Sequence, residues 1–493
     1  MGDTISAIST PPGEGGIGIV RLSGPSAIKI ADMIFYSPRG IKPSLGQSHR
    51  LYYGFIIDPE TGEKIDEVLL AVMRAPYTYT REDVVEINCH GGYIVLKRVL
   101  EITLRYGARL AMPGEFTMRA FLNGRIDLTQ AEAVIDLIKA KTEEAERLAI
   151  EHASGSLRRV VEDISGGLQD FLVEVEAYID FPEEDIFHSP LNLTERIKEF
   201  HERLRELSRS FYQGRVLREG LTTVIAGRPN VGKSSLLNAL LGTDRAIVTD
   251  IPGTTRDIIE EVINVKGIPL RLIDTAGIRE AKDIVEAEGI RRTEAAIERA
   301  EMTLFVIDGS QSITFYDISI LERLKEKKKR TIVVINKKDL GLVIKKEHEI
   351  FKGLPAIEIS VLKGEGINEL KELIFSVATE DMANLTASGV NGVGNSWRGL
   401  EAPYGTIITR QRHKVLIDEA LQAMEELYSL LNPHAMNING EVIVAEGSST
   451  SVPTELIAFF LRKALNSLNQ IIGIEFSEED LLQRIFSEFC IGK

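Results

Sequence analysis

The sequence predicts a multidomain protein: an α/β domain with a mostly parallel sheet and helices on both faces, inserted into a helical domain and preceded by an α+β domain. Three observations support this prediction. The chain has 493 residues, too many for one hydrophobic core. A glycine-rich stretch, Gly227–Ser235, separates a strand-like run from a helix-like run, as in parallel α/β domains. Long helical patterns occur both before and after that domain.

The predicted boundaries divide the chain into four parts. We expect the α+β domain over residues 1–122 and the first part of the helical domain over residues 123–217. The α/β domain follows over residues 218–380, and the second helical part covers residues 381–493. Such an insertion requires that the two ends of the inserted domain lie close together.

In the first part, apolar runs bounded by turn residues predict strands at Ile17–Leu22, Glu67–Met73 and Asp83–Asn88. Helical spacing of apolar residues predicts a helix over Tyr93–Tyr106. The stretch Gly13–Gly18 superficially matches a dinucleotide-binding fingerprint. It precedes a strand where that fingerprint follows one, so we exclude a dinucleotide site there.

The helical parts begin with a capping pattern, in which Thr129 is the predicted N-cap and Glu132 its reciprocal partner. Further helices are predicted over His413–Leu431 and Val452–Leu468. Two stretches carry apolar side chains at alternating spacings of three and four residues, and we interpret both as bundle core. These side chains are Leu157, Val161, Ile164, Leu168, Phe171 and Val175 in the first stretch and Ile197, Phe200, Leu204, Leu207 and Phe211 in the second.

Two polar stretches, Ala383–Tyr404 and Asn432–Ser451, are predicted as loops in or beside the helical domain. A basic run, Lys325–Arg330, is either a local nucleic-acid-binding patch or, as we favour, the solvated end of a helix before a strand. The net charge of −15 argues against broad nucleic-acid binding by the whole surface, though not against a local patch.

We expect a cytoplasmic protein without a membrane segment. Two cysteines, Cys89 and Cys490, are too few for a disulfide framework and suit a reducing compartment. No apolar run reaches the roughly eighteen residues of a membrane span. The N-terminus lacks the basic-then-apolar pattern of a secretion signal.

The stretch Gly227–Ser235 matches the Gly-x-x-x-x-Gly-Lys-Ser phosphate loop. Its two glycines let backbone N–H groups face an anion, and the following helix adds its positive end. We expect Lys233 to contact the β- and γ-phosphates and the Ser234 hydroxyl to bind Mg²⁺. The predicted nucleotide contacts from this loop are Asn230, Val231, Gly232, Lys233, Ser234 and Ser235.

Two later segments match the switch regions of phosphate-loop NTPases. The Thr255 hydroxyl is the predicted second Mg²⁺ ligand. Asp274 follows an apolar strand and is expected to hold Mg²⁺, while Gly277 is placed to sense the γ-phosphate. The predicted nucleotide contacts from these segments are Thr249, Asp250, Ile251, Pro252, Gly253, Thr254, Thr255, Asp274, Thr275, Ala276 and Gly277.

Guanine selectivity is predicted from Asn336, Lys337 and Asp339, which follow a buried strand, and from Ser360 in a further loop. A carboxylate at Asp339 can accept from guanine N1–H and from the exocyclic amine, whereas adenine has no donors in those places. The sequence therefore predicts a GTPase domain. The position after the Asp-x-x-Gly motif is Ile278, which cannot orient the attacking water, so Arg279, Glu280 and Glu286 become the nearby polar candidates.

Four segments, ISTPPGEGGIGIVRLSG, EDVVEINCHGG, PGEFTMRAFLNGRIDLTQAEAVIDLI and the C-terminal FCIGK, resemble the MnmE (TrmE) family of tRNA modification GTPases. The resemblance implies an N-terminal domain that forms a homodimer and binds 5-formyl- or methylene-tetrahydrofolate. The matching folate positions are Arg21, Glu86, Arg125 and Lys493. A carboxylate suits the pterin N–H donors, and cations suit the acidic glutamyl tail. Cys490 becomes a candidate functional cysteine.

For hydrolysis, the resemblance implies that Glu286 positions the water and that Arg279 supports the switch. It further implies that K⁺ lies beside the phosphates and that two GTPase domains pair across this face. The matching K⁺ ligands are Asn230 and the backbone carbonyls of Thr249, Ile251 and Thr254.

As a whole, the resemblance implies a potassium-stimulated GTPase acting with the FAD-dependent MnmG flavoprotein in a heterotetramer or larger assembly. The implied product is tRNA with a carboxymethylaminomethyl or aminomethyl group on C5 of the wobble uridine, the methylene carbon coming from a folate. One alternative is a regulatory or ribosome-assembly GTPase of the Era or EngA type. Another is a folate-binding enzyme with a merely regulatory GTPase. The nitrogen donor and the particular tRNAs stay open.

Overall fold

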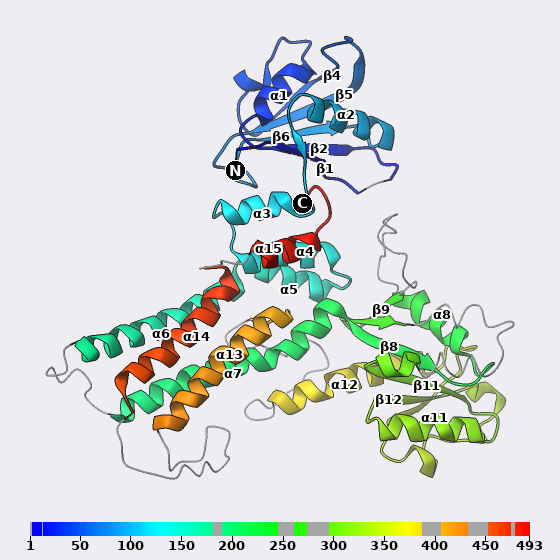
Figure 1. The fold of residues 1–493 in the computed structure, drawn as a ribbon. Coiled ribbons are helices and arrows are strands. Elements are labelled where there is room, and N and C mark those ends of the chain that lie inside the picture. Colours follow the sequence, from blue (N-terminus) through cyan, green and yellow to red (C-terminus); the bar gives the residue numbers. More distant parts are fainter. Residues whose placement is uncertain are drawn as a thin grey trace. The chain divides into compact units, whose positions relative to one another are not determined.

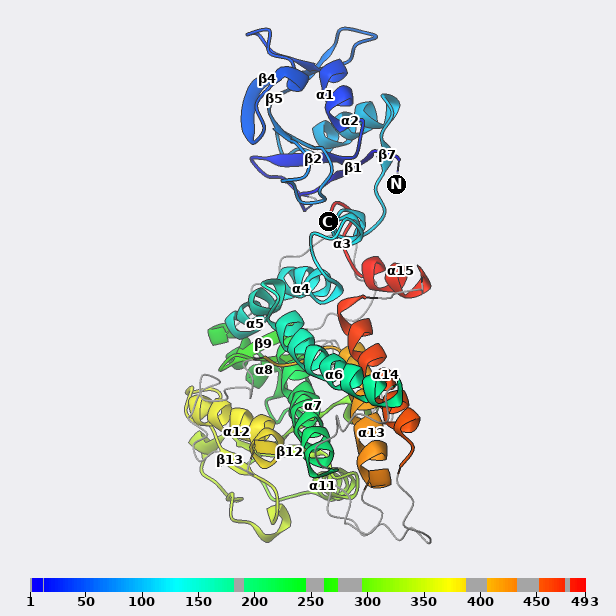
Figure 2. The same cartoon turned by 90° about the vertical axis from the view of Figure 1, so that its left-hand side faces the viewer.

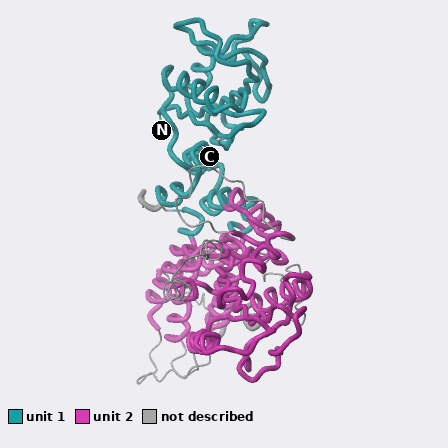
Figure 3. The backbone as a smooth tube through the Cα atoms, turned by 90° about the vertical axis from the view of Figure 1, so that its right-hand side faces the viewer, with its two compact units in different colours: residues 1–135, 152–158, 469–493 teal, residues 136–151, 159–468 magenta. Residues whose placement is uncertain are grey.

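The computed structural model describes residues 2–11, 13–180, 190–244, 261–273, 295–386, 406–431, 452–474 and 479–493 (Figure 1). The chain divides into two compact units (Figure 3). Unit 1 contains residues 1–135, 152–158 and 469–493, and unit 2 contains residues 136–151 and 159–468.

Unit 1 is built on a seven-stranded sheet with the order β3-β4-β5-β6-β2-β1-β7. Its strands are β1 (Ile5–Ile8), β2 (Gly18–Ser23), β3 (Phe35–Tyr36), β4 (Arg50–Ile57), β5 (Lys64–Met73), β6 (Val84–Cys89) and β7 (Arg109–Leu110). Neighbouring strands are antiparallel except β1 and β7. Helices α1 (Ala27–Ile34) and α2 (Tyr93–Arg105) bury their apolar residues against one face of this sheet (Figure 1). The three strands and the helix predicted for this part are confirmed.

The C-terminal segment completes unit 1. Helix α15 (Glu479–Ser487) packs Phe486, followed by Phe489, against Ala131 and Ile135 of α4 (Leu128–Lys139). Beyond α15, the last residues run beside the start of α3 (Glu115–Leu122), where the Phe116 N–H donates to the Lys493 carbonyl oxygen at 3.2 Å. A 3₁₀ turn at Pro43–Leu45 is the remaining short element of this unit.

The cap of α4 differs from the prediction. The helix begins at Leu128, so Thr129 lies inside its first turn. Asp127 Oδ1 accepts from the Gln130 N–H at 3.0 Å and from the Thr129 hydroxyl at 2.6 Å, and the Asp127 N–H donates to Gln130 Oε1 at 3.1 Å. The prediction of Thr129 as N-cap is therefore wrong. The earlier start buries Leu128 completely, and this apolar burial decides between two overlapping capping patterns.

Unit 2 contains a six-stranded sheet with the order β13-β12-β11-β8-β10-β9. Its strands are β8 (Leu221–Ala226), β9 (Glu261–Val265), β10 (Ile268–Leu272), β11 (Met302–Asp308), β12 (Arg330–Asn336) and β13 (Ala356–Glu358). All neighbours are parallel except β9 and β10. One face buries apolar residues of α8 (Lys233–Asp244) and α12 (Ile367–Thr386), and the other face buries those of α11 (Phe315–Glu326). This doubly covered, mostly parallel sheet is the predicted α/β domain.

The long helices of unit 2 come from both sides of that sheet in the sequence. They are α5 (Glu143–Ala153), α6 (Ser156–Asp180), α7 (Pro190–Glu219), α13 (Gln411–Leu431) and α14 (Thr454–Ile472). Helices α7 and α13 lie side by side (Figure 1 and Figure 2) and are joined by the Ser208 hydroxyl, which donates to Asp418 Oδ1 at 2.8 Å. The Ser467 hydroxyl of α14 donates to Glu419 of α13. Helices before and after the sheet therefore pack together, which confirms the predicted insertion of the α/β domain.

The two apolar stripes that were predicted as bundle core are buried. All six apolar side chains from Leu157 to Val175 are fully buried, and in the second stripe only Phe211 is half-buried. The four-part division at residues 122, 217 and 380 stays a prediction. Within the described residues, no helix is long and apolar enough to cross a lipid bilayer.

One of the two predicted loops differs in part from expectation. The predicted loop Ala383–Tyr404 is wrong at its start, because α12 continues through Thr386; residues 387–404 lie outside the described residues. The stretch 432–451 also lies outside them. The basic run Lys325–Arg330 follows the favoured interpretation, since α11 ends at Glu326 and β12 begins at Arg330. Lys329 Nζ donates to the Glu298 and Ala300 carbonyls at 2.9 and 2.7 Å.

The assignment of the α4 cap predicts the effect of two substitutions. Asp127→Ala removes the oxygen that accepts the Gln130 N–H, so the helix is expected to lose about 1 kcal/mol of stability. Hydrogen exchange of the first-turn amides of α4 then accelerates about five-fold. Thr129→Val removes a hydroxyl that only donates to Asp127, and is expected to change the exchange less. Faster exchange in Thr129→Val than in Asp127→Ala would restore Thr129 as the cap.

Candidate functional site

The candidate nucleotide site lies at the carboxyl ends of the parallel strands of unit 2, where ligands of such sheets bind. Residues 227–232 connect β8 to α8 as a tight loop. Gly227 and Gly232 have φ values of 145° and 103°, a region that side chains rarely adopt. A side chain at Gly227 would also collide with the Val306 carbonyl, and one at Gly232 with the Asn336 amide. Both glycines are therefore required by the backbone path of the loop.

Lys233 is folded back over this loop. Its Nζ donates to the carbonyl oxygens of Gly227 and Arg228 at 2.8 and 2.7 Å. Burial lowers the pKa of the Lys233 ammonium. Phosphate oxygens placed beside it would favour the charged form again. Ser234 and Ser235 are exposed in the first turn of α8, at the positive end of the helix.

Asn336 joins the phosphate loop to the base-recognition side. It is 4% exposed at the end of β12. Its Nδ2 donates to the Val231 carbonyl at 2.8 Å, and its Oδ1 accepts from the Val361 N–H at 3.1 Å. The residue predicted as a guanine-motif member therefore acts here as a bridge between two loops.

Asp339 and Ser360, predicted to recognise the base, are direct partners. The Ser360 hydroxyl donates to Asp339 Oδ1 at 2.6 Å, and this bond lowers the pKa of the Asp339 carboxyl. The Lys363 N–H in turn donates to the Ser360 oxygen at 3.2 Å. The carboxylate is thus ionised and oriented, as an acceptor of two guanine donors has to be.

Two acidic residues that were not predicted from the sequence hold basic side chains at the carboxyl ends of these strands. Asp308, at the end of β11, accepts from Lys337 Nζ at 2.7 Å. Asp317 holds Arg228 of the phosphate loop at 3.0 Å and also completes the capping box of α11 with Thr314. The sequence pattern Thr314-x-x-Asp317 is typical of a capping box and could have predicted the position of Asp317 at the start of α11.

The remaining predicted nucleotide and metal contacts lie outside the described residues. These are Thr249, Asp250, Ile251, Pro252, Gly253, Thr254, Thr255, Asp274, Thr275, Ala276 and Gly277, together with the hydrolysis candidates Ile278, Arg279, Glu280 and Glu286. Within the described part, the loop can cradle phosphates and the Asp339 edge can bind a base, so together they form the two ends of a nucleotide site.

A second candidate site lies in unit 1. Arg21 of β2 and Glu86 of β6 are cross-strand partners whose Nε and Oε1 are 2.8 Å apart. Arg21 Nη1 also donates to the Gly492 carbonyl at 3.3 Å, and its guanidinium lies 5.6 Å from the centre of the Phe116 ring. Burial and the charge of Arg21 lower the pKa of the Lys493 ammonium. Residues far apart in the sequence thus form one polar cluster.

Arg125 and Cys490, also predicted here, border that cluster. The Arg125 guanidinium lies 4.8 Å from the centre of the Tyr79 ring, and Tyr79 packs against the small core that contains Phe116. Cys490 is exposed, and its carbonyl oxygen accepts from the Lys493 N–H at 3.4 Å. Tyr79 and Phe116 were not predicted as site residues, because aromatic side chains at these spacings have no motif of their own.

Comparisons with known proteins cover the whole chain. The family described as "GTP-binding protein TrmE N-terminus" matches residues 4–125, and the "MnmE helical domain" family matches residues 128–490. The proteins named tRNA modification GTPase MnmE from Acetivibrio thermocellus and Geobacillus kaustophilus are each 45% identical to this chain, over 100% of it and 99% of their own length. The protein of that name from Bacillus subtilis is 44% identical over 100% of both chains.

Among solved structures, the G domain of the T. maritima FeoB iron transporter is similar to part of the chain. It is 32% identical, covers 32% of this chain and 98% of its own, and has a TM-score of 0.25.

The Asp339 geometry predicts a switch in base preference. Asp339→Asn replaces an acceptor by a donor, so GTP binding is expected to weaken about 10²- to 10⁴-fold, from the loss of two charge-assisted hydrogen bonds of about 1.5–3 kcal/mol each. Xanthosine triphosphate, which carries an acceptor where guanine has a donor, is expected to bind the variant better than GTP. Competition binding with both nucleotides measures this. The matched control Ser360→Ala keeps the carboxylate and should retain GTP preference; unchanged GTP binding by Asp339→Asn would contradict the assignment.

Proposed function

The chain belongs to the MnmE family of tRNA modification GTPases, and from this premise we propose the reaction in which it takes part. Together with the FAD-dependent MnmG flavoprotein, in a heterotetramer or larger assembly, it adds a carboxymethylaminomethyl or aminomethyl group to C5 of the wobble uridine of certain tRNAs. A folate supplies the one-carbon unit, and GTP hydrolysis drives the conformational cycle.

The observation that carries this proposal is the position of the C-terminal tail in unit 1. The Gly492 carbonyl accepts from Arg21 at 3.3 Å, and the charges of Arg21 and Glu86 act on the neighbouring Lys493 ammonium, although the tail is far from both in the sequence. A carboxylate near two cations suits a ligand with N–H donors at one end and carboxylates at the other. We propose that Glu86 binds the pterin edge of 5-formyl- or methylene-tetrahydrofolate and that Arg21, Arg125 and Lys493 bind its acidic tail. When bound, the folate supplies the methylene carbon.

For GTP, we propose that the loop of residues 230–235 holds the phosphates and that Ser234 and Thr255 bind Mg²⁺, with Asp274 beside them. Asn336, Lys337, Asp339 and Ser360 select guanine. The support lies in the hydrogen bonds that orient Asp339 and connect Asn336 to the phosphate loop.

For hydrolysis, we propose a K⁺ ion held by Asn230 and by the backbone carbonyls of Thr249, Ile251 and Thr254. Asn230 is exposed with a φ of 63°, a left-handed conformation that asparagine tolerates better than most residues. Its side-chain oxygen is a hard ligand that suits such a cation. Glu286 positions the water, and Arg279 supports the switch.

The proposed assembly is a homodimer through the N-terminal domain, acting in the cytoplasm, where two GTPase domains pair across the face that binds K⁺. Pairing would explain how a domain without a Ras-type glutamine completes its site. Cys490 is retained as a candidate functional cysteine because its thiol is exposed next to Lys493.

The potassium proposal predicts a cation-dependent rate. GTP turnover in KCl is expected to exceed turnover in NaCl at equal ionic strength by roughly 10-fold or more, because the cation takes a place where an arginine finger is worth about 10³–10⁵. Asn230→Ala and Asn230→Gly should both lose the difference. The glycine variant keeps the left-handed backbone without strain, so it tests the loss of the side-chain oxygen alone. Asn230→Asp keeps an oxygen that can bind K⁺, so its turnover should still be faster in KCl than in NaCl. Equal turnover in both salts would exclude the K⁺ site.

The tRNA proposal predicts a change in nucleosides. In cells that lack this protein, mass spectrometry of tRNA is expected to show wobble uridines without the C5 group. The unaltered gene should restore the modification, whereas Glu86→Gln, which keeps the shape but removes the charge, should restore it poorly. Unchanged wobble uridines in the deletion strain would overturn the proposed function.

A further inference from the structure

The turn over residues 77–82 in unit 1 takes part in the sites described above only through Tyr79, whose ring lies beside Arg125. Thr78 Oγ1 donates to the Glu82 carbonyl at 2.6 Å and closes the turn. At its base, the Ala75 N–H donates to Asp83 Oδ1 at 3.0 Å. The chain segments that enter and leave the turn are therefore held next to each other, with Thr78 and Thr80 buried between them and Tyr77 and Arg81 exposed.

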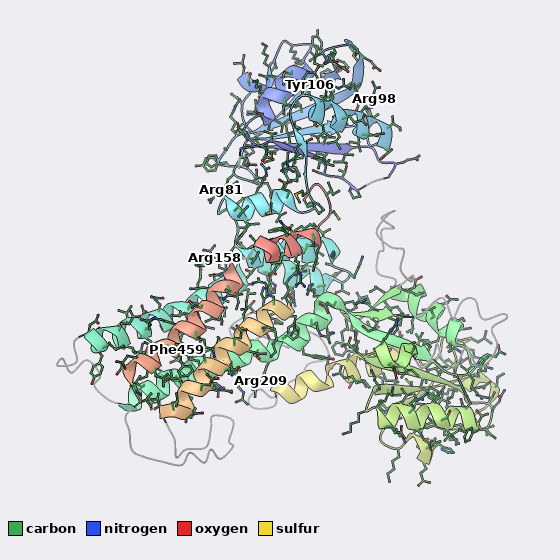
Figure 4. All side chains as sticks on the ribbon, viewed as in Figure 1. Arg81, Arg98, Tyr106, Arg158, Arg209 and Phe459 are labelled. Carbon is green, nitrogen blue, oxygen red and sulfur yellow. The ribbon has the colours of Figure 1, made fainter. Side chains whose placement is uncertain are left out.

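The turn is also fixed to α3. The Tyr79 hydroxyl is 2.9 Å from the Thr117 hydroxyl, and Asn123 Nδ2 donates to the Thr80 carbonyl at 2.6 Å. Arg81 Nη1 donates to the Asn123 carbonyl at 2.9 Å, next to the end of α3 (Figure 4). Arg81 has a φ of 59°, which is costly for this residue and persists because these bonds hold it. The surface is therefore preorganised.

Two kinds of side chain face outward from this turn. The Tyr77 side chain is 83% exposed, so its ring is not part of a core. Arg81 and Arg125 are exposed as well, and the Arg125 guanidinium lies 4.8 Å from the centre of the Tyr79 ring. We refer to Tyr77, Tyr79, Arg81 and Arg125 as the aromatic–arginine surface.

Two acidic residues near this surface, Glu82 and Glu115, are paired within unit 1. Glu82 accepts from the fully buried Arg119 at 3.1 Å and from the Ser23 hydroxyl at 2.6 Å. Glu115 accepts from Arg109 at 2.6 Å and from Arg119 at 3.0 Å. Glu82 and Glu115 are thus paired within unit 1, and the charged residues of the aromatic–arginine surface itself, Arg81 and Arg125, are exposed cations on a chain whose net charge is −15.

We propose that the aromatic–arginine surface binds an unstacked nucleotide of single-stranded RNA, namely the anticodon loop of the substrate tRNA; this rests on the proposed function. Loop bases are recognised by stacking on aromatic rings and arginine planes, and arginines also pair with the phosphates. A base that is modified on its ring has to leave the stack to reach an active site. Neither Tyr77 nor Arg81 is among the proposed folate residues.

The position of the surface supports this assignment over docking of a second protein copy. Arg125 belongs both to the aromatic–arginine surface and to the proposed folate residues, and its guanidinium lies 4.8 Å from the centre of the Tyr79 ring. The proposed RNA surface therefore adjoins the proposed one-carbon site at Arg125. A nucleotide bound there would lie beside the proposed folate.

Binding of the full-length protein to a fluorescent anticodon stem-loop with uridine at the wobble position tests the proposal. Tyr77→Ala is expected to weaken binding roughly 5- to 100-fold, the effect of losing one base–aromatic stack. Tyr77→Phe should bind like the unaltered protein. Arg81→Gln should weaken binding and reduce the salt slope by about one. A fully paired RNA hairpin with a short closing loop should bind less tightly than the stem-loop.

Matched controls are Tyr93→Ala and Arg98→Gln on α2, where Tyr93 is 63% exposed and Arg98 pairs with Glu63. Unfolding temperatures verify that all variants fold. The inference is overturned if the unaltered protein does not bind the stem-loop, if Tyr77→Ala and Arg81→Gln bind normally, or if the controls weaken binding equally. A change in oligomeric state without a change in RNA affinity would reassign the surface to a protein contact and also overturn it.

The two proposals can fail separately. If the deletion strain keeps its wobble modification while Tyr77→Ala still weakens loop binding, the proposed reaction is wrong and the RNA surface stands. If the modification depends on this protein but Tyr77→Ala binds normally, the RNA surface is wrong and the proposed reaction stands.

Discussion

The nucleotide half of the molecule depends on one buried amide. Asn336 is hydrogen-bonded on one side to the phosphate loop and on the other to the loop after β13, so the distance between the phosphate-binding and base-binding ends is set by a single side chain. Gly232 has to be a glycine partly because that amide occupies the space beside it. In a buried setting an unpaired amide is costly, so breaking either bond disturbs both loops together.

In unit 1 the comparable constraint is the packing of the C-terminal tail against β2 and α3. The sheet brings Arg21 opposite Glu86, and the tail places Lys493 beside them and its backbone against α3. Each of these charged residues would be an unremarkable surface group by itself. Together they form a partly buried cluster with both signs of charge. Burial and the charge of Arg21 lower the pKa of the Lys493 ammonium there. This cluster therefore exists only when two distant parts of the chain are folded together.

Much of the secondary structure could be predicted because it follows local periodicity. The alternating apolar runs of β2, β5 and β6 and the stripes of α6 and α7 have a spacing that only one regular structure buries. The cap of α4 was missed because Asp127 and Thr129 offer overlapping patterns, and only the burial of Leu128 against neighbouring elements selects the earlier start. The end of α12 was missed because polar composition does not by itself stop a helix, since each further residue only extends hydrogen bonds that are already formed.

The sequence by itself determined the phosphate-loop motif, the candidate guanine-selecting residues and the family, because these depend on residue types at fixed short spacings. Only the tertiary structure decided that Asn336 bridges two loops, that Asp308 and Asp317 support the nucleotide edge, and that the C-terminal tail reaches Arg21 through the Gly492 carbonyl. The physical reason is the range of the interaction. Backbone geometry repeats over a few residues and is visible in a motif, whereas hydrogen bonds and charge pairs between distant segments exist only after the chain has brought them together.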